Sequence, residues 1–415
     1  MNDAMREAKE ILNQVQDDTS CRFSMTKLRI ALVVPHMFMH RSILPQVIFS
    51  PGHLALDLAN GLQQLGAEVT LFTPGPVDTT ATNVTADLSY FENELKLRGD
   101  TYLSLLKKHP LTFITLARQV QSELIAKAFQ AANAGEFDIV HMYTNEEDTA
   151  LPFAALCNKP VVFTHHDPYN FMVKYKNNFP KYKHLHWISF SYSQRRSMPA
   201  DTNWVANIYH GFTPTPDQQC ARLDLAQPYF AYLGRIIEPK GVHLAIAAVK
   251  EYNKTAPQSM KLKIAGKHYG DSEKHSYWLE RIQPELSEYI EYVGFIDSTI
   301  AKQKFLASAA ALLVPSVFEE PFGMVSVEAL AVGTPVIALD SGALPEVVEQ
   351  GKTGWVAKKV YNAKTLNEPK TIKNLQSALT KWPEISRKKC KDSYSARFTT
   401  TRMCEQYLAA YKKVL

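Results

Sequence analysis

Short apolar runs alternate with stretches of helical periodicity over most of the chain. Strands covered on both faces read as continuous apolar runs, and those in the first half predict strands at 28–34, 68–73, 138–143, 161–165, 187–190 and 203–209. Between the first two runs, leucines recur at helical spacing until Gly66, and a less regular helical region covers about 88–134. This order of strand, helix and strand predicts a doubly wound α/β domain.

A second series of the same kind follows a segment rich in turn-forming residues. Residues 211–217 carry glycine, proline and threonine without periodicity, which is typical of a linker. Further apolar runs predict strands at 229–234, 262–265, 290–293, 311–314 and 335–339. A closing helix over about 399–414 carries Met403, Tyr407 and Tyr411 on one face. The fold class is therefore predicted to be α/β, with two Rossmann-like doubly wound domains that face each other across a cleft.

The predicted domain boundaries follow from these two series. Residues 1–24 resemble a polar amphipathic helix and are interpreted as an appendage, because Met25 is a natural start for the folded part. The remaining units are an N-terminal Rossmann-like domain at 25–210, a linker at 211–227, a C-terminal Rossmann-like domain at 228–395 and a closing helix at 396–415. We expect the closing helix to pack back on the N-terminal domain.

The composition is that of an ordinary soluble globular protein. Of the 415 residues, 46% are hydrophobic and 21% are charged, and this length exceeds what one core usually holds. The sequence contains no apolar run long enough to predict a membrane span, and its first residues lack the features of a secretory signal. Five scattered cysteines without metal-like spacing favour a reducing, cytoplasmic location. The net charge of +5 is too small to indicate a nucleic-acid partner.

The stretch from 171 to 196 combines cations with aromatic residues and contains no acidic residue. Two interpretations are open for it, a solvated loop and helix face or a surface for an anionic acceptor or anionic lipid headgroups. The cations are Lys174, Lys176, Lys181, Lys183, Arg195 and Arg196, and the aromatic residues between them are Phe171, Tyr175, Phe179, Tyr182 and Trp187.

Two glutamates flank the start of a predicted helix directly after a buried strand. The strand is 311–314, the helix is 323–332, and Glu320 and Glu328 lie just before and about two turns into that helix. A helix N-terminus binds anions, and ionised carboxylates accept hydrogen bonds from hydroxyl groups. The pattern suggests a ligand with phosphate in its middle and hydroxyl-rich groups at both ends, such as a nucleotide-sugar. On its own, the pair is better explained by glutamates that cap or solvate an ordinary helix, because short motifs match by chance.

Two cations follow the strand that ends at Gly234. Arg235 and Lys240 suit a diphosphate, because Arg offers paired donors and Lys a point charge. The alternative for this segment is a surface ion pair with Glu238.

The segment from Pro315 to Gly354 closely resembles the donor half of retaining glycosyltransferases of family 4, and the resemblance extends over nearly the whole chain after residue 25. The matching features are Glu320 and Glu328, Gly333-Thr334-Pro335-Val336-Ile337, the run 342–348, Gly234-Arg235, Lys240-Gly241, Tyr209-His210-Gly211 at the hinge, and the closing helix.

This resemblance implies the two-domain GT-B fold and transfer of a sugar from a nucleotide donor, a UDP- or GDP-sugar, with retention at the anomeric carbon. It assigns Glu320 to the donor-sugar hydroxyls and Glu328 to the ribose. Backbone N–H groups of the run Phe322, Gly323, Met324 and Val325 would hold sugar or phosphate. Arg235 and Lys240, beside Gly234, would hold the diphosphate and stabilise the leaving group, so that neither a metal ion nor a cofactor is expected.

In the N-terminal half, 159–167 resembles the family's strand that ends in a histidine facing the reacting sugar. Counting from Pro160 places His166, and not His165, at that position. His166 would accept a hydroxyl bond or brace the reacting geometry, while Asp167 could fix its tautomer. The alternative is a pair of strand-end histidines bonded to backbone.

The acceptor side departs from the family. Where the family has paired glycines after the first strand, this chain has Phe49 and Ser50, with Gly52 nearby. Glycine supplies backbone angles and clearance that phenylalanine cannot, so either the loop 40–52 is re-routed or acceptor binding differs. Ser50, Gly52 and Asp167 remain acceptor-side candidates. So do Arg195 and Arg196, for which a bracing role at the hinge is preferred.

The resulting expectation is a cytoplasmic glycosyltransferase that acts on a hydroxyl acceptor in cell-envelope glycan or glycolipid synthesis, with peripheral contact to the inner membrane face. The alternatives are a GT-B relative acting as an epimerase or phosphorylase, and a nucleotide-sugar-binding protein without catalysis. No feature singles out the lysine that a pyridoxal-phosphate phosphorylase would need.

Overall fold

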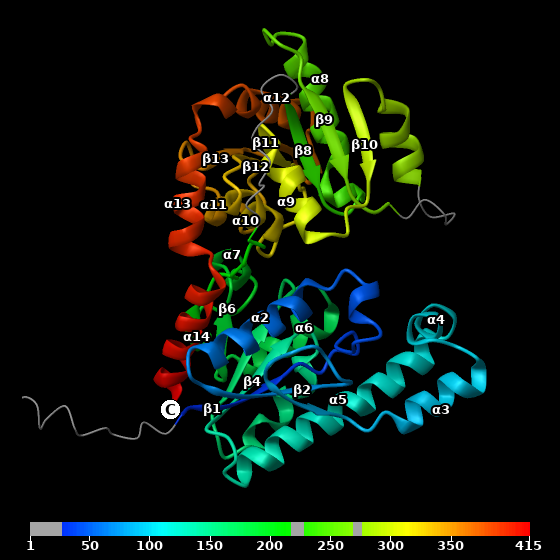
Figure 1. Ribbon diagram of the computed structural model, residues 1–415, viewed down its shortest axis with the longest axis vertical. Helices are drawn as coiled ribbons and strands as arrows, with labels where there is room; N and C mark the ends of the chain where they lie inside the picture. Colours follow the sequence, from blue (N-terminus) through cyan, green and yellow to red (C-terminus); the bar gives the residue numbers. More distant parts are fainter. Residues whose placement is uncertain (1–26, 217–227, 269–275) are drawn as a thin grey trace, which may run out of the picture.

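Two α/β units stacked along the long axis make up the molecule (Figure 1). The computed structural model describes residues 27–216, 228–268 and 276–415. The predicted appendage at 1–24 and the linker residues 217–227 lie outside the described residues. The two sheets confirm the predicted fold class of two Rossmann-like domains.

The N-terminal domain is built on a parallel sheet with the strand order β3-β2-β1-β4-β5-β6-β7. Its central strands are buried because helices cover both faces, which explains their continuous apolar sequences. The strands are β1 (Arg29–Val33), β2 (Glu68–Thr73), β3 (Thr82–Thr85), β4 (Ile139–Thr144), β5 (Val161–His165), β6 (His186–Ser189) and β7 (Trp204–Asn207).

Two apolar clusters fill this domain, one on each face of the sheet. One forms around the long helix α5 and the other beneath α2. The helices are α2 (Ser50–Gln64), α3 (Ser89–Arg98), α4 (Tyr102–Lys108), α5 (Pro110–Asn133), α6 (Val173–Asn178) and α7 (Tyr192–Arg195). Short 3₁₀ turns occupy Leu44–Gln46, Glu147–Thr149, Leu151–Leu156 and Phe179–Tyr182.

The C-terminal domain has a second parallel sheet with the order β10-β9-β8-β11-β12-β13. Its strands are β8 (Tyr229–Leu233), β9 (Lys261–Ala265), β10 (Ile290–Gly294), β11 (Ala311–Val314), β12 (Val336–Leu339) and β13 (Gly354–Ala357), and a small hairpin pairs β14 (Tyr361–Asn362) with β15 (Thr365–Leu366). Its helices are α8 (Val242–Asn253), α9 (Thr299–Ala307), α10 (Met324–Ala331), α11 (Leu344–Val347), α12 (Glu368–Leu379) and α13 (Arg387–Arg397). A 3₁₀ turn at Glu238–Lys240 precedes α8, a π-helical turn and a 3₁₀ turn occupy Trp278–Ile282 and Gln283–Glu285, and another 3₁₀ turn lies at Trp382–Glu384.

The last helix, α14 (Thr400–Val414), packs on the N-terminal domain. Helices α13 and α14 run along the same side of both units (Figure 1). The Tyr411 hydroxyl lies 2.7 Å from Nδ1 of the buried His141, whose Nε2 lies 2.9 Å from the Thr164 hydroxyl. A Cβ at Gly61 would come 2.5 Å from Cys404 Sγ, so the glycine lets α14 approach α2.

Four strands of the described residues have no counterpart among the predicted strands. β3 is a half-exposed edge strand of sequence Thr-Asn-Val-Thr. Because this sequence is mostly polar, a search for apolar runs does not predict it as a strand. β13 begins with a glycine, and β14 and β15 have two residues each. Among the described residues, no helix combines the length and apolar character that crossing a membrane requires.

Candidate functional site

Lys240 and Glu320 meet at the carboxyl ends of two neighbouring strands. The ammonium of Lys240 pairs with Glu320 Oε1, and Ser316 Oγ donates to the same oxygen at 2.7 Å. Glu320 is only 6% exposed. The Lys240 partner is therefore Glu320 and not Glu238, which excludes the surface pair considered from the sequence.

Close backbone approaches hold the loops of these two residues together. The amides of Val317 and Phe318 donate to the Pro239 carbonyl, at 2.9 and 3.1 Å. Gly241 has a φ of +71°, and a Cβ there would collide with the Pro315 carbonyl oxygen. Glycine at this position is therefore what allows the turn with Lys240 to lie against the loop after β11.

The Glu320 backbone is held from its other side by the loop before α11. Ala343 N donates to the Glu320 carbonyl at 2.8 Å. Gly342 has a φ of +56°, and a Cβ there would collide with the same carbonyl. Gly323, with a φ of +90°, then turns the chain into α10, whose first N–H groups have no partner within the helix. The predicted anion-binding turn, from Phe322 to Val325, is thus a real helix start beside Glu320.

Arg235 follows β8, beside Gly234, and its side chain is exposed. Its carbonyl accepts a hydrogen bond from the Tyr232 hydroxyl at 2.8 Å. Burial raises the pKa of Asp167 in the N-terminal domain, and the positive charge of Arg235 partly offsets this rise. The charges of these two predicted site residues therefore interact across the domain boundary.

His166 directly follows β5, which ends at His165. Its ring lies parallel to that of His210 with centroids 5.1 Å apart, and His210 in turn packs against Phe322 of the donor-side loop at 5.0 Å. Burial lowers the pKa of His166 well below its ordinary value and lowers that of His210 to about 3. Nε2 of His166 is buried without a hydrogen-bond partner among the described residues. A neutral imidazole with a free ring nitrogen thus lies where the two domains meet.

His165, the neighbouring histidine, faces the opposite side of the sheet, as alternate residues of a strand do. It packs in the core against Tyr175 and Tyr169, with centroids 4.5 and 5.3 Å apart. Asp167 accepts a hydrogen bond from Asn145 Nδ2 at 2.6 Å. The suggested role of Asp167 in fixing the His166 tautomer is therefore not reflected in this structure, where its carboxylate secures the loop after β4.

Glu328 lies on α10, partly buried, and burial raises the pKa of its carboxyl to about 7. Lys302 of α9 opposes this rise. The same lysine contributes to lowering the pKa of His53 on α2. At the start of α10, Met324 packs against the apolar cluster beneath α2, so α10 borders the N-terminal domain.

The loop 40–52, predicted to lie on the acceptor side, packs its unusual phenylalanine into the N-terminal domain. Phe49 turns inward, is 7% exposed and stacks on His36 with ring centroids 4.3 Å apart. A Cβ at Gly52 would come 2.7 Å from Phe49 Cδ1 and 2.8 Å from Met39 Sδ, so this glycine makes room for side chains. Of the two candidates here, buried Gly52 serves packing, whereas Ser50 at the start of α2 is exposed.

The two arginines of the 171–196 stretch make contacts of different kinds. Arg195 donates from Nε to Ser189 Oγ at 2.6 Å and lies 4.7 Å from the centre of the Trp204 ring. Arg196 pairs across the domain boundary with Glu319 at 3.3 Å, although both side chains are at least 60% exposed and the pair contributes little stability.

The rest of this stretch is largely structural. Lys174 pairs with Glu146 and Asp148, and Lys183 pairs with Asp201. The aromatic residues Tyr175, Phe179 and Trp187 are buried in the core, while Phe171 is exposed. A solvated, ion-paired face therefore describes the lysines better than a continuous basic surface.

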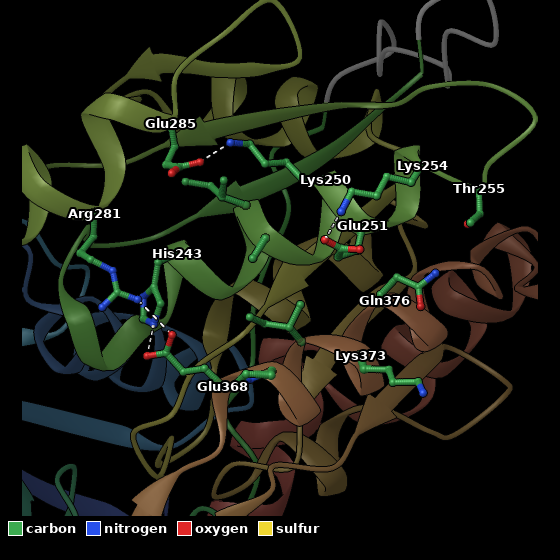
Figure 2. Close-up of a pocket in the computed structure, with 14 residues that line it drawn as sticks. His243, Lys250, Glu251, Lys254, Thr255, Arg281, Glu285, Glu368, Lys373 and Gln376 are labelled. Atoms are coloured by element: carbon green, nitrogen blue, oxygen red, sulfur yellow. Dashed lines mark hydrogen bonds and ion pairs between the residues drawn. The ribbon is translucent and has the colours of Figure 1, made fainter.

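A cavity of about 740 Å³ lies elsewhere, along α8 and α12 of the C-terminal domain (Figure 2). Helix faces, rather than the loops that follow strands, form most of it. Its charges compensate one another, because Arg281 pairs with Glu368, Lys254 with Glu251, and Lys250 with Glu285. Within 27–216, 228–268 and 276–415, no three His, Cys, Asp or Glu residues are grouped as a metal site.

Three residues at the site were not among the sequence candidates, namely His210, Gln194 and Glu346. His210 lies in the hinge motif, yet only the fold shows that it stacks on His166. Gln194 and Glu346 make hydrogen bonds to backbone groups from distant parts of the chain, and no sequence spacing predicts such contacts.

Two sequence families cover the two domains in turn. The family described as Glycosyltransferase Family 4 matches residues 52–218, and Glycosyl transferases group 1 matches 217–388. Among curated relatives, Spore coat protein SA of Bacillus subtilis is 27% identical over 44% of this chain and 48% of its own length. Alpha-maltose-1-phosphate synthase of Mycolicibacterium smegmatis is 27% identical over 50% of this chain and 54% of its own length. The chain thus spans about half the length of these relatives.

Solved structures resemble nearly the whole chain. The sucrose-phosphate synthase from Thermosynechococcus elongatus superposes with a TM-score of 0.64 and 19% identity, over 93% of this chain and 99% of that one. Anabaena HepE in complex with UDP-glucose gives a TM-score of 0.61 at 15% identity, over 93% and 100% of the two chains. The fold is of the GT-B type, with glycosyltransferase segments in both halves.

Proposed function

We propose that this protein is a retaining glycosyltransferase that moves a sugar from a nucleotide-sugar donor to a hydroxyl acceptor. The observation that carries the proposal is the Lys240–Glu320 pair beside the start of α10, opposite His166 and Asp167 of the other domain. A carboxylate for hydroxyl groups, cations for phosphate and a neutral imidazole then occupy one region.

Each group has a role that its contacts permit. Lys240 uses one of its three N–H donors on Glu320, which leaves two for a diphosphate. Glu320 has one oxygen engaged by Lys240 and Ser316, and the other is available to a sugar hydroxyl. Arg235, exposed and interacting electrostatically with Asp167, supplies the second positive charge. Glu328 on α10 would bind the ribose.

The transfer breaks the bond between the anomeric carbon and the phosphate oxygen and forms a bond to the acceptor oxygen. The acceptor proton leaves to the departing diphosphate or to water, and negative charge builds on the diphosphate. Lys240 and Arg235 stabilise that charge without a metal ion. Neutral His166, with Nε2 unpartnered, accepts a hydrogen bond from a sugar hydroxyl and fixes the sugar against the acceptor.

Finer assignments extend the same proposal. A UDP-sugar is the first donor to test, because HepE is described with UDP and with UDP-glucose; a GDP-sugar is the second. We further propose a cytoplasmic enzyme of envelope glycan or glycolipid synthesis that touches anionic membrane. Since Lys174 and Lys183 are ion-paired, Lys176 and Lys181 would carry that contact. Flotation with anionic vesicles tests it, and unchanged binding of the doubly neutralised variant would exclude it.

The central test is a thermal-shift panel of UDP- and GDP-sugars, followed by transfer assays with the stabilising donor. A ligand at 100 times its Kd stabilises by about 2.7 kcal/mol. Glu320→Gln should abolish transfer, whereas Glu285→Gln, on the outer cavity, should not. A donor that binds without any turnover, including hydrolysis, would favour the non-catalytic alternative. No stabilisation by any donor would contradict the proposal as a whole.

A further inference from the structure

Gln194 holds the backbone on both sides of His166. Its side chain is 4% exposed, and Nε2 donates to the carbonyl of His165 at 2.6 Å and to that of Asp167 at 3.1 Å. An amide nitrogen has two protons, and both are used here. One buried side chain thereby holds the peptide group between His165 and His166 and the peptide group that follows Asp167.

The orientation of Gln194 is itself determined. Its Oε1 accepts from Phe190 N at 3.4 Å, and its backbone N–H donates to Ser191 Oγ at 3.1 Å. The side chain thus donates at one end and accepts at the other. Leucine at this position would remove the donor that Gln194 supplies to both carbonyls, and glutamate would place negative charge against them.

The same short segment is attached to the loops that hold Glu320. Ser191 Oγ donates to the carbonyl of Pro321, the residue after Glu320, at 2.9 Å. The carboxylate of Glu346, on α11, accepts from the amides of Tyr192 and Ser193 at 2.8 and 2.6 Å. Since the loop before α11 bonds the Glu320 backbone through Ala343, α7 contacts both supports of the donor-side carboxylate.

We propose that Gln194 is a positioning residue for His166, and that α7 couples the position of this histidine to the Glu320 loop. The inference rests on the proposed function, because it takes His166 to face the reacting sugar. It adds that the geometry of His166 is set through α7 by the loops that would bind the donor. A change in the Glu320 loop would then be transmitted to the histidine across the domain boundary.

The first test needs no donor. Histidine ring signals are recorded by NMR in ¹⁵N-histidine-labelled full-length protein, with His166 assigned through its loss in His166→Gln. Gln194→Leu and the shorter amide Gln194→Asn should both shift the His166 signal and leave that of His141 unchanged, because His141 is held by Tyr411 and Thr164. The matched control is Gln121→Leu, which removes another buried glutamine of the same domain. An unmoved His166 signal in a folded Gln194 variant would overturn the proposal.

The second test separates positioning from general damage. With UDP-glucose as the probe, Gln194→Leu should lower kcat for donor turnover by about 100-fold, since misplacement by about 1 Å costs that much. Affinity for UDP should be unchanged. In the His166→Gln background, Gln194→Leu should cause no further loss, because a positioning residue acts through its target. Additive losses would overturn the coupling. A wild type that turns over no donor would refute the proposed function, while the NMR result would still decide the role of Gln194.

Discussion

The ammonium of Lys240 and the carboxylate of Glu320 form an ion pair although they lie 80 positions apart in the sequence. Their side chains are 22% and 7% exposed, so the pair is partly shielded from water. Removing one partner of such a pair leaves the other charge buried and uncompensated. If the proposed function is right, stability and donor binding depend on the same two residues.

Lys240→Met should destabilise the protein by about 3 kcal/mol, because it leaves the Glu320 carboxylate without its counterion. Lys250→Met is the matched control, since Lys250 also pairs with a glutamate but both side chains are over 40% exposed. That change should cost less than about 1 kcal/mol. Urea unfolding measures both values. Equal losses of stability in the two variants would contradict the conclusion that the Lys240–Glu320 pair is shielded from water.

Glu328→Gln should alter the pH dependence of stability. Burial raises the folded-state pKa of Glu328 to about 7, above its ordinary value of 4.5, so the folded protein binds this proton more tightly than the unfolded chain does. Its contribution to stability is therefore complete below about pH 4.5 and lost as the pH rises to about 7. Glutamine abolishes this loss, and the variant should be more stable than wild type at pH 8 relative to pH 5. Parallel stability curves would show that Glu328 does not titrate in this range.

The same carboxyl predicts a pH effect on the donor. An ionised carboxylate is the better acceptor for ribose hydroxyls, so affinity for UDP should increase as the pH rises through about 7. Calorimetry between pH 6 and 8 measures this increase, and Glu328→Gln should bind more weakly with a flat profile. An equally steep profile in the variant would assign the effect to another group.

Gly342→Ala should damage both stability and donor binding. The residue has a φ of +56°, and its new Cβ would collide with the Glu320 carbonyl. Gly99→Ala is the control, because Gly99 has a φ of +65° but no atom within 4 Å of the added carbon. The free energy of unfolding of the control should fall only by the cost of a left-handed backbone at alanine, about 1–2 kcal/mol, and its UDP affinity should be unchanged. If both variants lose the same stability and UDP affinity, the close approach of Gly342 to the Glu320 carbonyl does not matter for either property.

Transfer should persist after treatment with a chelator. The proposed stabilisation of the leaving diphosphate comes from the side chains of Lys240 and Arg235 and involves no metal ion. Assays with and without EDTA, using metal-free buffers, should give the same rate, whereas Lys240→Met should lower it. Loss of activity with EDTA that Mg²⁺ restores would refute the metal-independent mechanism.

Sequence patterns predicted the fold better than the contacts of the site. Buried strands such as 161–165 and 311–314 were predicted with their observed bounds, because covered parallel strands must be continuously apolar. The neighbourhood of Lys240 and Glu320 could be foreseen from strand ends and the family resemblance. The ion-pair partner of Lys240 could not be foreseen, since Glu238 and Glu320 are both chemically suitable partners.

Other features depend on tertiary packing alone. Phe49 could be recognised as unusual, but only the structure shows that it stacks on His36 and that Gly52 makes room for it. The contacts of Gln194 with the carbonyls beside His166 join residues 27 and 29 positions apart, through groups that every residue carries. Backbone acceptors leave no signature in a sequence.

The return of α14 to the first domain has a consequence for biosynthesis. The apolar surface that Met403, Tyr407 and Tyr411 cover belongs to the half of the chain that a ribosome makes first. That surface stays without its partner until α14 has been synthesised. The N-terminal domain would then begin folding early and finish last, and shortening the chain by its final helix would destabilise the domain most distant from the cut in sequence.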